Sequence, residues 1–365
     1  MSDDGNEAWK ELVRQPLRGA PAYVVAAHPN AIKLDANESP YPLSRAAMEA
    51  MARELASVEL NRYPDATAGD LRRALAARAG CAVEELMLGN GSDELIALLC
   101  ATFAEPRAGQ SRGKIAYAVP GFVVFRTAAL AHGLEPIEVP FGPRMEADEA
   151  ALFAAIAEHK PNLVFLATPN NPTGTQWSRA TVVKLVEQHR DIITVVDEAY
   201  LSYCDARSCV DLALANPNCV VLQTLSKIGL AALRVGLLIG RREVLAAVEK
   251  VRPPYNLSTL AQRAALKLVV DFKAELASHF EEAKRQRRAL YDALGQLAGL
   301  EVFPSGGNFL LVRAKEARAL YDALVERGVL VRLFDSGLLT GCMRITVGTP
   351  EENSWLLDAI KAALV

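Results

Sequence analysis

The stretch from residue 220 to residue 240, VVLQTLSKIGLAALRVGLLIG, constrains the fold of this chain more than any other. Its pattern predicts a buried strand at 220–225, a short loop rich in Gly and Ala, and a second apolar strand at 235–239. Ser226 and Lys227 directly follow the first strand. Desolvation of a lysine ammonium lowers its pKa toward the nucleophilic amine, which is the setting that a Schiff-base lysine requires. The alternative is a solvated lysine just past the end of a strand.

Length and composition favour a large globular protein. The chain has 365 residues, more than the roughly 250 to 300 at which single cores stop growing, so we expect two domains. Its net charge of -3 gives no electrostatic reason to bind nucleic acid or an anionic membrane. No apolar run approaches the roughly 18 residues of a membrane span, and the acidic start lacks a secretory signal, so we expect a cytoplasmic location. The six scattered cysteines have no zinc-like spacing, so we expect reduced thiols and no metal site.

Short apolar strands alternate with helices in the middle of the chain. This pattern is typical of a largely parallel sheet that is covered by helices on both faces. The predicted strands are 115–119, 135–140 and 163–167, a further strand lies within 191–200, and helices are predicted at 146–159 and 178–189. Ligands of such sheets bind at the carboxyl ends of the strands. Polar side chains follow the strands at that edge: Asn170, Asn171 and Thr173, then Asp197 and Tyr200, then Ser226 and Lys227.

The segment LGNGSD, residues 88–93, predicts a helix start suited to an anion. Two glycines precede Ser92, which we expect to cap an apolar helix at 94–103. Backbone amides, a hydroxyl and a helix N-terminus then converge at one point, which favours phosphate. The segment matches neither GxGxxG nor the P-loop, so no dinucleotide or nucleoside triphosphate is indicated. An ordinary Gly-Ser start of a helix remains the alternative.

The C-terminal third has mixed character. We expect helices at 260–297 and 316–327, strands at 329–334 and 342–347, and a capping box at 349–352 that opens the last helix. Arg344 lies in the last of these strands, where a surface ion pair is its ordinary role. Two proline-stiffened loops lie near the start of the chain: KLDANESPYP at 33–42 and NRYPD at 61–65.

Several motifs together resemble a known family. TPNNPTG (168–174), VVDEAY (195–200), TLSK (224–227) and LRVG (233–236) resemble the fold-type I aminotransferases, which use pyridoxal phosphate. LDANESPYP, NRYPD, LGNGSDE, SGGNFLLVR and GCMRITVGTPEEN are similar, more narrowly, to the histidinol-phosphate aminotransferase family. The resemblance implies an α/β fold: a large domain whose mostly parallel sheet lies between helices, and a smaller α+β domain. We expect an N-terminal arm and part of the small domain at 1–60, the large pyridoxal-phosphate-binding domain at 61–270, and the small domain at 271–365.

The resemblance also implies roles for individual residues. Lys227 would form the Schiff base with the cofactor and then move the substrate proton, and Asp197 would pair with the pyridinium nitrogen. Asn171 and Tyr200 would donate hydrogen bonds to the phenolate oxygen of the cofactor. Phe122 falls where the family stacks an aromatic ring, commonly tyrosine, on the cofactor.

A further set of residues would bind the phosphate of pyridoxal phosphate: Gly91, Ser92, Asp93, Ser226 and Arg234. The segment between Lys227 and Arg234 is often one residue longer in the family, so we expect a tighter loop here. The loop at 335–341 has no charged residue after Asp335, which leaves substrate preference open.

Four residues are implied at the substrate and at a neighbouring subunit. Arg344 would hold the substrate carboxylate as a bidentate fork. Tyr41 and Arg332 would contact the substrate phosphate. Tyr63 would reach the cofactor phosphate of a neighbouring chain, which implies a homodimer.

The function implied is transfer of an amino group between histidinol phosphate and 2-oxoglutarate, a step of histidine biosynthesis. Its partners would be a small-molecule amino donor and a 2-oxo acid. The alternatives on the same scaffold are an aromatic amino acid aminotransferase and a threonine-phosphate decarboxylase. A non-catalytic regulator that senses pyridoxal phosphate is a more distant alternative, because the roughly 30 residues before the first motif are too short and acidic for a DNA-binding domain.

Overall fold

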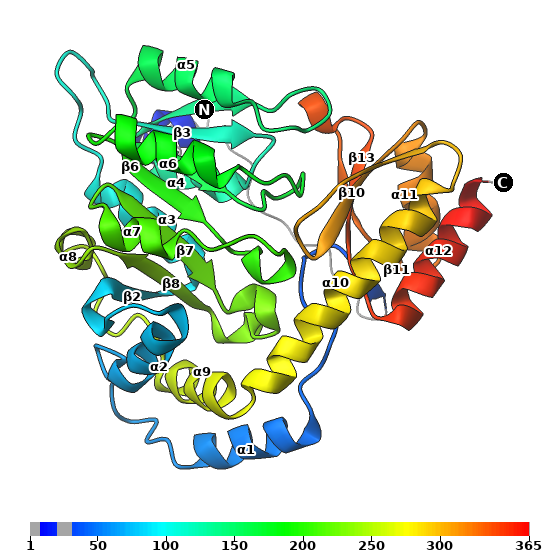
Figure 1. The fold of residues 1–365 in the computed structure, drawn as a ribbon, viewed down its shortest axis with the longest axis horizontal. Coiled ribbons are helices and arrows are strands. Elements are labelled where there is room, and N and C mark those ends of the chain that lie inside the picture. Colours follow the sequence, from blue (N-terminus) through cyan, green and yellow to red (C-terminus); the bar gives the residue numbers. More distant parts are fainter. Residues whose placement is uncertain (1–7, 20–30, 365) are drawn as a thin grey trace, which may run out of the picture.

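A seven-stranded sheet forms the centre of the larger part of the molecule (Figure 1). The computed structural model describes residues 8–19 and 31–364. In spatial order the strands are β2 (Leu86–Asn90), β8 (Val235–Gly240), β7 (Cys219–Thr224), β6 (Ile193–Asp197), β5 (Leu163–Ala167), β3 (Lys114–Val119) and β4 (Glu135–Pro140). β8 is antiparallel to β2 and β7, and the other pairings are parallel. The prediction of a mostly parallel sheet is therefore confirmed.

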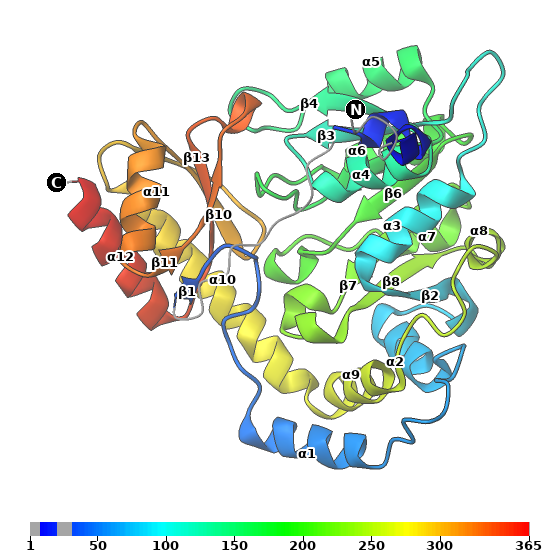
Figure 2. The ribbon, with the colours of Figure 1, turned by 180° about the vertical axis from the view of Figure 1, so that it is seen from behind.

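Helices cover both faces of this sheet, as Figures 1 and 2 show from opposite sides. Alternate strand residues point to opposite faces, so Ile115 and Tyr117 pack in one core and Ala116 and Ala118 in the other. The first core is completed by α3 (Gly91–Thr102), α4 (Val123–Ala131) and α8 (Arg242–Glu249). The second is completed by α2 (Gly69–Ala79), α5 (Glu149–His159), α6 (Arg179–Gln188), α7 (Val210–Ala215) and α9 (Thr259–Asp271).

A smaller antiparallel sheet lies beside the larger part. Its order is β12 (Arg332–Phe334), β13 (Cys342–Thr346), β10 (Phe309–Ala314) and β9 (Leu300–Phe303). One face packs on α11 (Ala317–Glu326), α12 (Pro350–Leu364) and the C-terminal half of α10 (Lys273–Gly295). In Figure 1 the long α10 runs from α9 to this sheet, so one continuous helix connects the two parts.

The N-terminal segment also spans the two parts. β1 (Ile32–Lys33) pairs in parallel with β11 (Val329–Leu330) next to the small sheet. α1 (Arg45–Ala56) then lies beside α9, as both views show. The segment 34–44 therefore crosses from one part to the other. Of the predicted arm, residues 8–19 form two short 3-10 turns (Ala8–Leu12 and Gln15–Leu17), and 20–30 lie outside the described residues. The domain boundaries stay a prediction.

Three expectations about elements are corrected. Ser92 does not cap α3: the helix begins at Gly91 after Asn90, so Ser92 lies in its first turn. The expected strand 329–334 is two strands, because β11 pairs with β1 whereas β12 pairs with β13. The expected helix 260–297 is broken at Phe272.

The capping box at the last helix is confirmed. The Thr349 amide donates to Glu352 Oε2 at 2.8 Å, and the Glu352 amide donates to Thr349 Oγ1 at 3.2 Å. Among the described residues, no helix has the length and hydropathy needed to span a membrane.

Candidate active site

The carboxyl ends of β5, β6 and β7 bring three polar loops to one edge of the large sheet. The three strands are parallel, and their register places Ala167 beside Asp197 and Asp197 beside Leu222. Asn171 follows the first of these strands, and Lys227 follows the third in a 3-10 turn at Ser226–Ile228. The edge predicted from the sequence therefore gathers these side chains.

Lys227 points its amine toward the N-terminal segment and Tyr200. Nζ donates to the Ala36 carbonyl at 3.2 Å and lies 5.8 Å from the centroid of the Tyr200 ring. The lysine is half-buried, and its carbonyl accepts a hydrogen bond from the Tyr203 hydroxyl. The amine is therefore accessible, and the hydrogen bond from Tyr203 holds the backbone that carries it.

Asp197 is a buried carboxyl that favours a cation beside it. Burial raises its pKa to about 7, and the nearby Asp93 and Glu198 act in the same direction. The Ala199 amide, which donates to Oδ1 at 3.0 Å, and Lys227 act in the opposite direction. A cation held against this carboxyl would lower its pKa and keep it ionised.

The start of α3 and the loop before β8 form an anion cradle. Arg234 Nη1 donates to Ser226 Oγ at 3.2 Å, and Nη2 donates to Asp93 Oδ2 at 3.1 Å. Gly91 has φ +78°, and its amide donates to the Arg234 carbonyl at 2.8 Å. A Cβ on Gly91 would lie 2.5 Å from Arg234 Nη2, and one on Gly236 would lie 2.6 Å from the Ser92 nitrogen. The backbone conformation favours glycine at Gly91, and the close approach of the Gly91 and Ser92 backbone requires glycine at Gly236.

The tight loop after Lys227 brings its arginine to this cradle. Gly229 and Arg234 both have positive φ, +94° and +52°, which lets the short segment turn back on itself. Arg234 consequently lies next to Ser226, although the loop is shorter than is common in the family.

Arg344 connects the small sheet to the edge of the large sheet. Nη1 donates to Asn171 Oδ1 at 2.6 Å, and Nη2 donates to the Asp35 carbonyl. Tyr200 packs edge-on against Phe309 with ring centroids 5.1 Å apart. The structure therefore gathers side chains of both parts around Asn171 and Tyr200.

Phe122 stands at the N-cap of α4 and packs edge-on against Phe125. The loop before it is tied to the same edge, because Asn170 Nδ2 donates to the Pro120 carbonyl at 3.0 Å.

Three further predicted residues take no part in the hydrogen bonds described above. Tyr41 stacks on His279 of α10, and burial followed by the charge of Glu282 raises its pKa to about 12. Tyr63 is 81% exposed and stacks on Tyr255 with ring centroids 4.7 Å apart. Arg332 is exposed on β12, directly opposite Arg344 on β13.

Sequence reasoning missed Asn37. This residue is completely buried, has φ +54°, and donates from Nδ2 to the Tyr200 hydroxyl oxygen at 3.0 Å. Thr346 and Asn308 also hydrogen-bond to it. The only signal in the sequence was its place in the motif LDANESPYP.

Comparison with known proteins decides the family. The model of the family "Aminotransferase class I and II" matches residues 29–360. Histidinol-phosphate aminotransferase 1 of Burkholderia lata is 40% identical over 361 residues, which cover 97% of this chain and 98% of that protein. The chain belongs to the histidinol-phosphate aminotransferases. A second relative in this family, histidinol-phosphate aminotransferase 2 of Burkholderia pseudomallei, is 41% identical over 360 residues, 97% of this chain and 99% of that protein.

The fold is that of a histidinol-phosphate aminotransferase as well. The crystal structure of this enzyme from Sinorhizobium meliloti, in complex with pyridoxal 5'-phosphate, superposes with a TM-score of 0.83 at 25% identity. The match covers 92% of this chain and 90% of that chain. The predicted fold-type I architecture is confirmed.

The residues present fit pyridoxal phosphate. The cradle of Gly91, Ser226 and Arg234 offers a helix N-terminus, a hydroxyl and a guanidinium to a phosphate. The buried Asp197 offers a carboxylate to a protonated ring nitrogen. Within the described residues, no group of three or more His, Cys, Asp or Glu side chains could hold a metal ion.

Proposed function

We propose that this protein transfers the amino group of histidinol phosphate to 2-oxoglutarate. The observation that carries the proposal is the full-length identity of about 40% to histidinol-phosphate aminotransferases. Pyridoxal phosphate is the cofactor, and the reaction belongs to histidine biosynthesis. The gathering of Lys227, Asp197 and Arg234 at one edge of the sheet supports this assignment.

The chemistry divides between the cofactor and the chain. When bound, pyridoxal phosphate takes up the electron pair that is released as the Cα–H bond of the substrate breaks. The Lys227 amine would accept the proton from Cα of the substrate and would donate it to the cofactor, because the amine is accessible at the edge of the sheet. The Asp197 carboxylate would pair with a protonated ring nitrogen, and the low dielectric around Asp197 would strengthen that interaction.

The remaining residues bind and orient. Asn171 and Tyr200 would donate to the phenolate oxygen of the cofactor, and Phe122 would pack on its ring. A further group would hold its phosphate: Gly91, Ser92, Asp93, Ser226 and Arg234. The Asp93 carboxylate contributes by orienting Arg234, to which it is bonded, because a carboxylate cannot itself donate to a phosphate.

Substrate binding would depend on two arginines of the small sheet. Arg344 and Arg332 face each other across β12 and β13, so two positive charges lie on neighbouring strands. Arg344 would hold the carboxylate of the 2-oxo acid, and Arg332 would hold the phosphate of the donor. Tyr41, whose buried hydroxyl makes no hydrogen bond within the described residues, would add a contact to the phosphate of the donor.

We also propose that the protein is a cytoplasmic homodimer. A groove of about 790 Å³ runs beside the anion cradle, and its walls include Asn90, Arg234, Tyr63 and Tyr255. Three exposed residues with large apolar side chains line it: Tyr63, Tyr255 and Leu260. A second copy of this chain would cover the groove and bring its own Tyr63 to the cofactor phosphate.

A panel of donors tests the proposed reaction. We expect kcat/KM for histidinol phosphate to exceed that for histidinol, phenylalanine and threonine phosphate. Arg332→Ala should reduce the preference for histidinol phosphate over histidinol about tenfold, because a charge-assisted contact to the phosphate is lost. Arg318→Ala, an exposed arginine on α11, is the control and should keep the preference.

The alternatives give different results in the same panel. Equal rates for phenylalanine and histidinol phosphate would favour an aromatic aminotransferase. Release of carbon dioxide from threonine phosphate would favour the decarboxylase. A protein that binds pyridoxal phosphate but turns over no donor would favour the regulator.

A further inference from the structure

Three consecutive residues of the crossing segment each hold one side chain of the candidate site. The Asp35 carbonyl accepts a hydrogen bond from Arg344 Nη2, and the Ala36 carbonyl accepts one from Lys227 Nζ at 3.2 Å. Asn37 Nδ2 donates to the Tyr200 hydroxyl oxygen at 3.0 Å. Asn37 is the only one of the three that acts through its side chain, and that side chain is completely buried.

Asn37 forms hydrogen bonds through its backbone N–H and through both ends of its side-chain amide. The Asn37 backbone N–H donates to Thr346 Oγ1 at 3.0 Å, so this hydroxyl already accepts one bond. Thr346 Oγ1 lies 3.2 Å from Asn37 Oδ1 and donates its single hydrogen there. Oδ1 therefore faces Thr346, and the NH2 group faces Tyr200.

This orientation determines where the Tyr200 hydrogen can go. A hydroxyl has one hydrogen to donate and lone pairs that accept. Since Asn37 is a donor, it occupies a lone pair of the Tyr200 oxygen and cannot take its hydrogen. Among the described residues, no other group hydrogen-bonds to this oxygen.

We propose that Asn37 is a positioning residue that keeps the Tyr200 hydroxyl hydrogen directed at the phenolate oxygen of the cofactor. The proposal rests on the proposed function, in which Tyr200 contacts that oxygen. A bond accepted from Asn37 also polarises the Tyr200 hydroxyl and makes it a stronger donor. Asn37 is hydrogen-bonded to Thr346, which lies on β13 two residues from Arg344. The donor strength of Tyr200 is therefore linked to the strand that carries the proposed substrate arginine.

The backbone of Asn37 limits which substitutions give a clean test. Its φ of +54° lies in the left-handed region, which Gly, Asn and Asp adopt most readily. Asn37→Gly removes the donor and keeps the backbone. Asn37→Asp keeps the shape but, when ionised, offers only acceptors, so it turns the Tyr200 hydrogen away from the cofactor.

The readout is the pH at which the visible absorbance of the bound cofactor changes, which does not require turnover. The proton on the Lys227 nitrogen is held more tightly when the neighbouring phenolate oxygen keeps its full negative charge. A hydrogen bond from Tyr200 draws charge from that oxygen. Loss of the bond should therefore raise the apparent pKa of the absorbance change.

We expect Tyr200→Phe and Asn37→Asp to raise this pKa by about one unit, and Asn37→Gly to raise it by less. The double variant Asn37→Gly with Tyr200→Phe should match Tyr200→Phe alone, because the two residues act through one bond. Asn218→Asp is the matched control: Asn218 is also buried and donates to the Val186 carbonyl at 3.0 Å, away from the site. It should lower the Tm of the cofactor-free protein without moving the absorbance titration.

The outcomes distinguish the proposed role of Asn37 from the proposed reaction. If both Asn37 variants titrate like the unmodified protein while Tyr200→Phe is shifted, Asn37 only anchors the segment and the proposal is wrong. An unshifted Tyr200→Phe would also overturn it. Failure to use histidinol phosphate would defeat the proposed reaction but not the titration, which needs only bound pyridoxal phosphate.

Discussion

The Asp197 carboxyl couples the protonation of the site to the stability of the fold. Its pKa rises from 3.8 to about 7 on folding, chiefly because it is buried. Between these values the folded state binds the proton more tightly than the unfolded state, so the resulting stability is present at low pH and is lost as pH rises toward 7. The cofactor-free protein should therefore carry an unfavourable buried charge above that pH.

Asp197→Asn removes this dependence. We consider the difference in free energy of unfolding between the variant and the unmodified chain, both without cofactor. This difference should increase in favour of the variant by about 2 to 3 kcal/mol from pH 5 to pH 8. Urea unfolding at both pH values measures the difference. Asp65→Asn is the control. Hydrogen bonds from Gly69 and Thr67 lower the pKa of Asp65, so this carboxyl stays ionised from pH 5 to pH 8. The difference in free energy of unfolding between Asp65→Asn and the unmodified chain should therefore not change with pH. A constant difference for Asp197→Asn would mean that the carboxyl is ionised in the cofactor-free fold.

The sequence was informative for residues whose role depends on a neighbouring strand. Lys227 and Asp197 each follow an apolar strand of a parallel sheet, so topology alone gathers them. Asn37 was missed because its partners, Tyr200 and Thr346, are distant in sequence and its left-handed backbone leaves no periodic pattern. Tertiary contacts of this kind have no local signature.

At the scale of the element, the start of α3 combines a strained backbone with a close contact. Gly91 has φ +78°, and an added Cβ would lie 2.5 Å from Arg234 Nη2. Gly91→Ala should therefore displace the arginine and lower the affinity for pyridoxal phosphate at least about tenfold, as a lost charge-assisted bond would. Fluorescence titration of the cofactor-free protein measures this affinity.

Gly80 is a matched control for that variant. It lies at the C-cap of α2 with φ +73°, and nothing lies within 4 Å of an added Cβ. Gly80→Ala should cost stability through the backbone alone, about 1 kcal/mol, and leave cofactor affinity unchanged. Equal losses of affinity in the two variants would show that backbone strain, and not the arginine contact, governs binding.

Most elements could be predicted because their local pattern and their tertiary role agree. β5 was expected at Leu163–Ala167 and is found there, since an apolar run of this length buries both faces. The start of α3 was not predicted at Gly91, because the Gly91 amide donates to the Arg234 carbonyl, which lies in the loop before β8 and is distant in sequence. Residues 329–334 likewise form two strands, because one part pairs with β1 and the other with β13. No local pattern reveals these partners.

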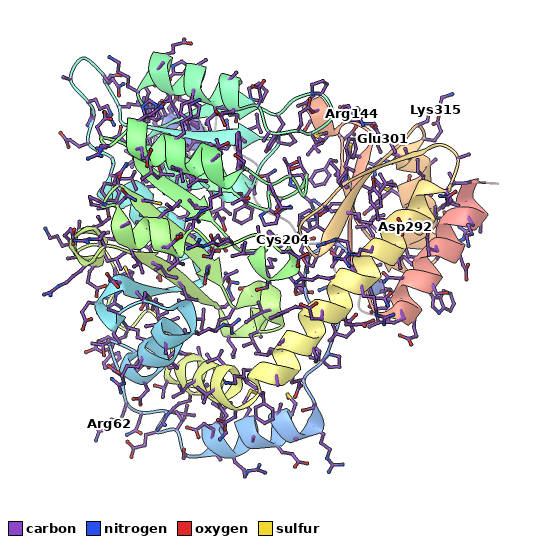
Figure 3. The ribbon with its side chains drawn as sticks, viewed as in Figure 1. Arg62, Arg144, Cys204, Asp292, Glu301 and Lys315 are labelled. Atoms are coloured by element: carbon purple, nitrogen blue, oxygen red, sulfur yellow. The ribbon has the colours of Figure 1, made fainter. Side chains whose placement is uncertain are left out.

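At the scale of the whole molecule, Tyr63 is difficult to explain within one chain. It is 81% exposed, stacks on Tyr255, and borders a groove that also contains Arg234. Figure 3 shows Arg62, the preceding residue, at the outside of the molecule below α2. A twofold dimer would exchange the two loops reciprocally and place each Tyr63 by the anion cradle of the other chain. The alternative is a tyrosine that serves only its own subunit.

Subunit mixing separates these two arrangements. Tyr63→Ala removes the hydroxyl proposed to contact the cofactor phosphate, and Lys227→Ala removes the amine proposed to move the proton. If the loop crosses, a mixed dimer collects both defects in one site and keeps the other intact. With random mixing, half of the dimers are mixed and half of their sites are intact, so activity should rise to about a quarter of that of the unmodified protein. Differential tags confirm the mixing.

The same experiment can contradict the shared site. If each Tyr63 serves its own subunit, every site in the mixed dimer carries one defect, so activity should not exceed the mean of the two parents. Arg45→Ala with Lys227→Ala controls for a general effect of mixing, because Arg45 is an exposed residue that forms an ion pair with Glu49 on the same helix. That mixture should show half of the Arg45→Ala activity, as simple dilution requires. A confirmed mixture of the Tyr63 and Lys227 variants without recovered activity would mean that each site is built from one chain.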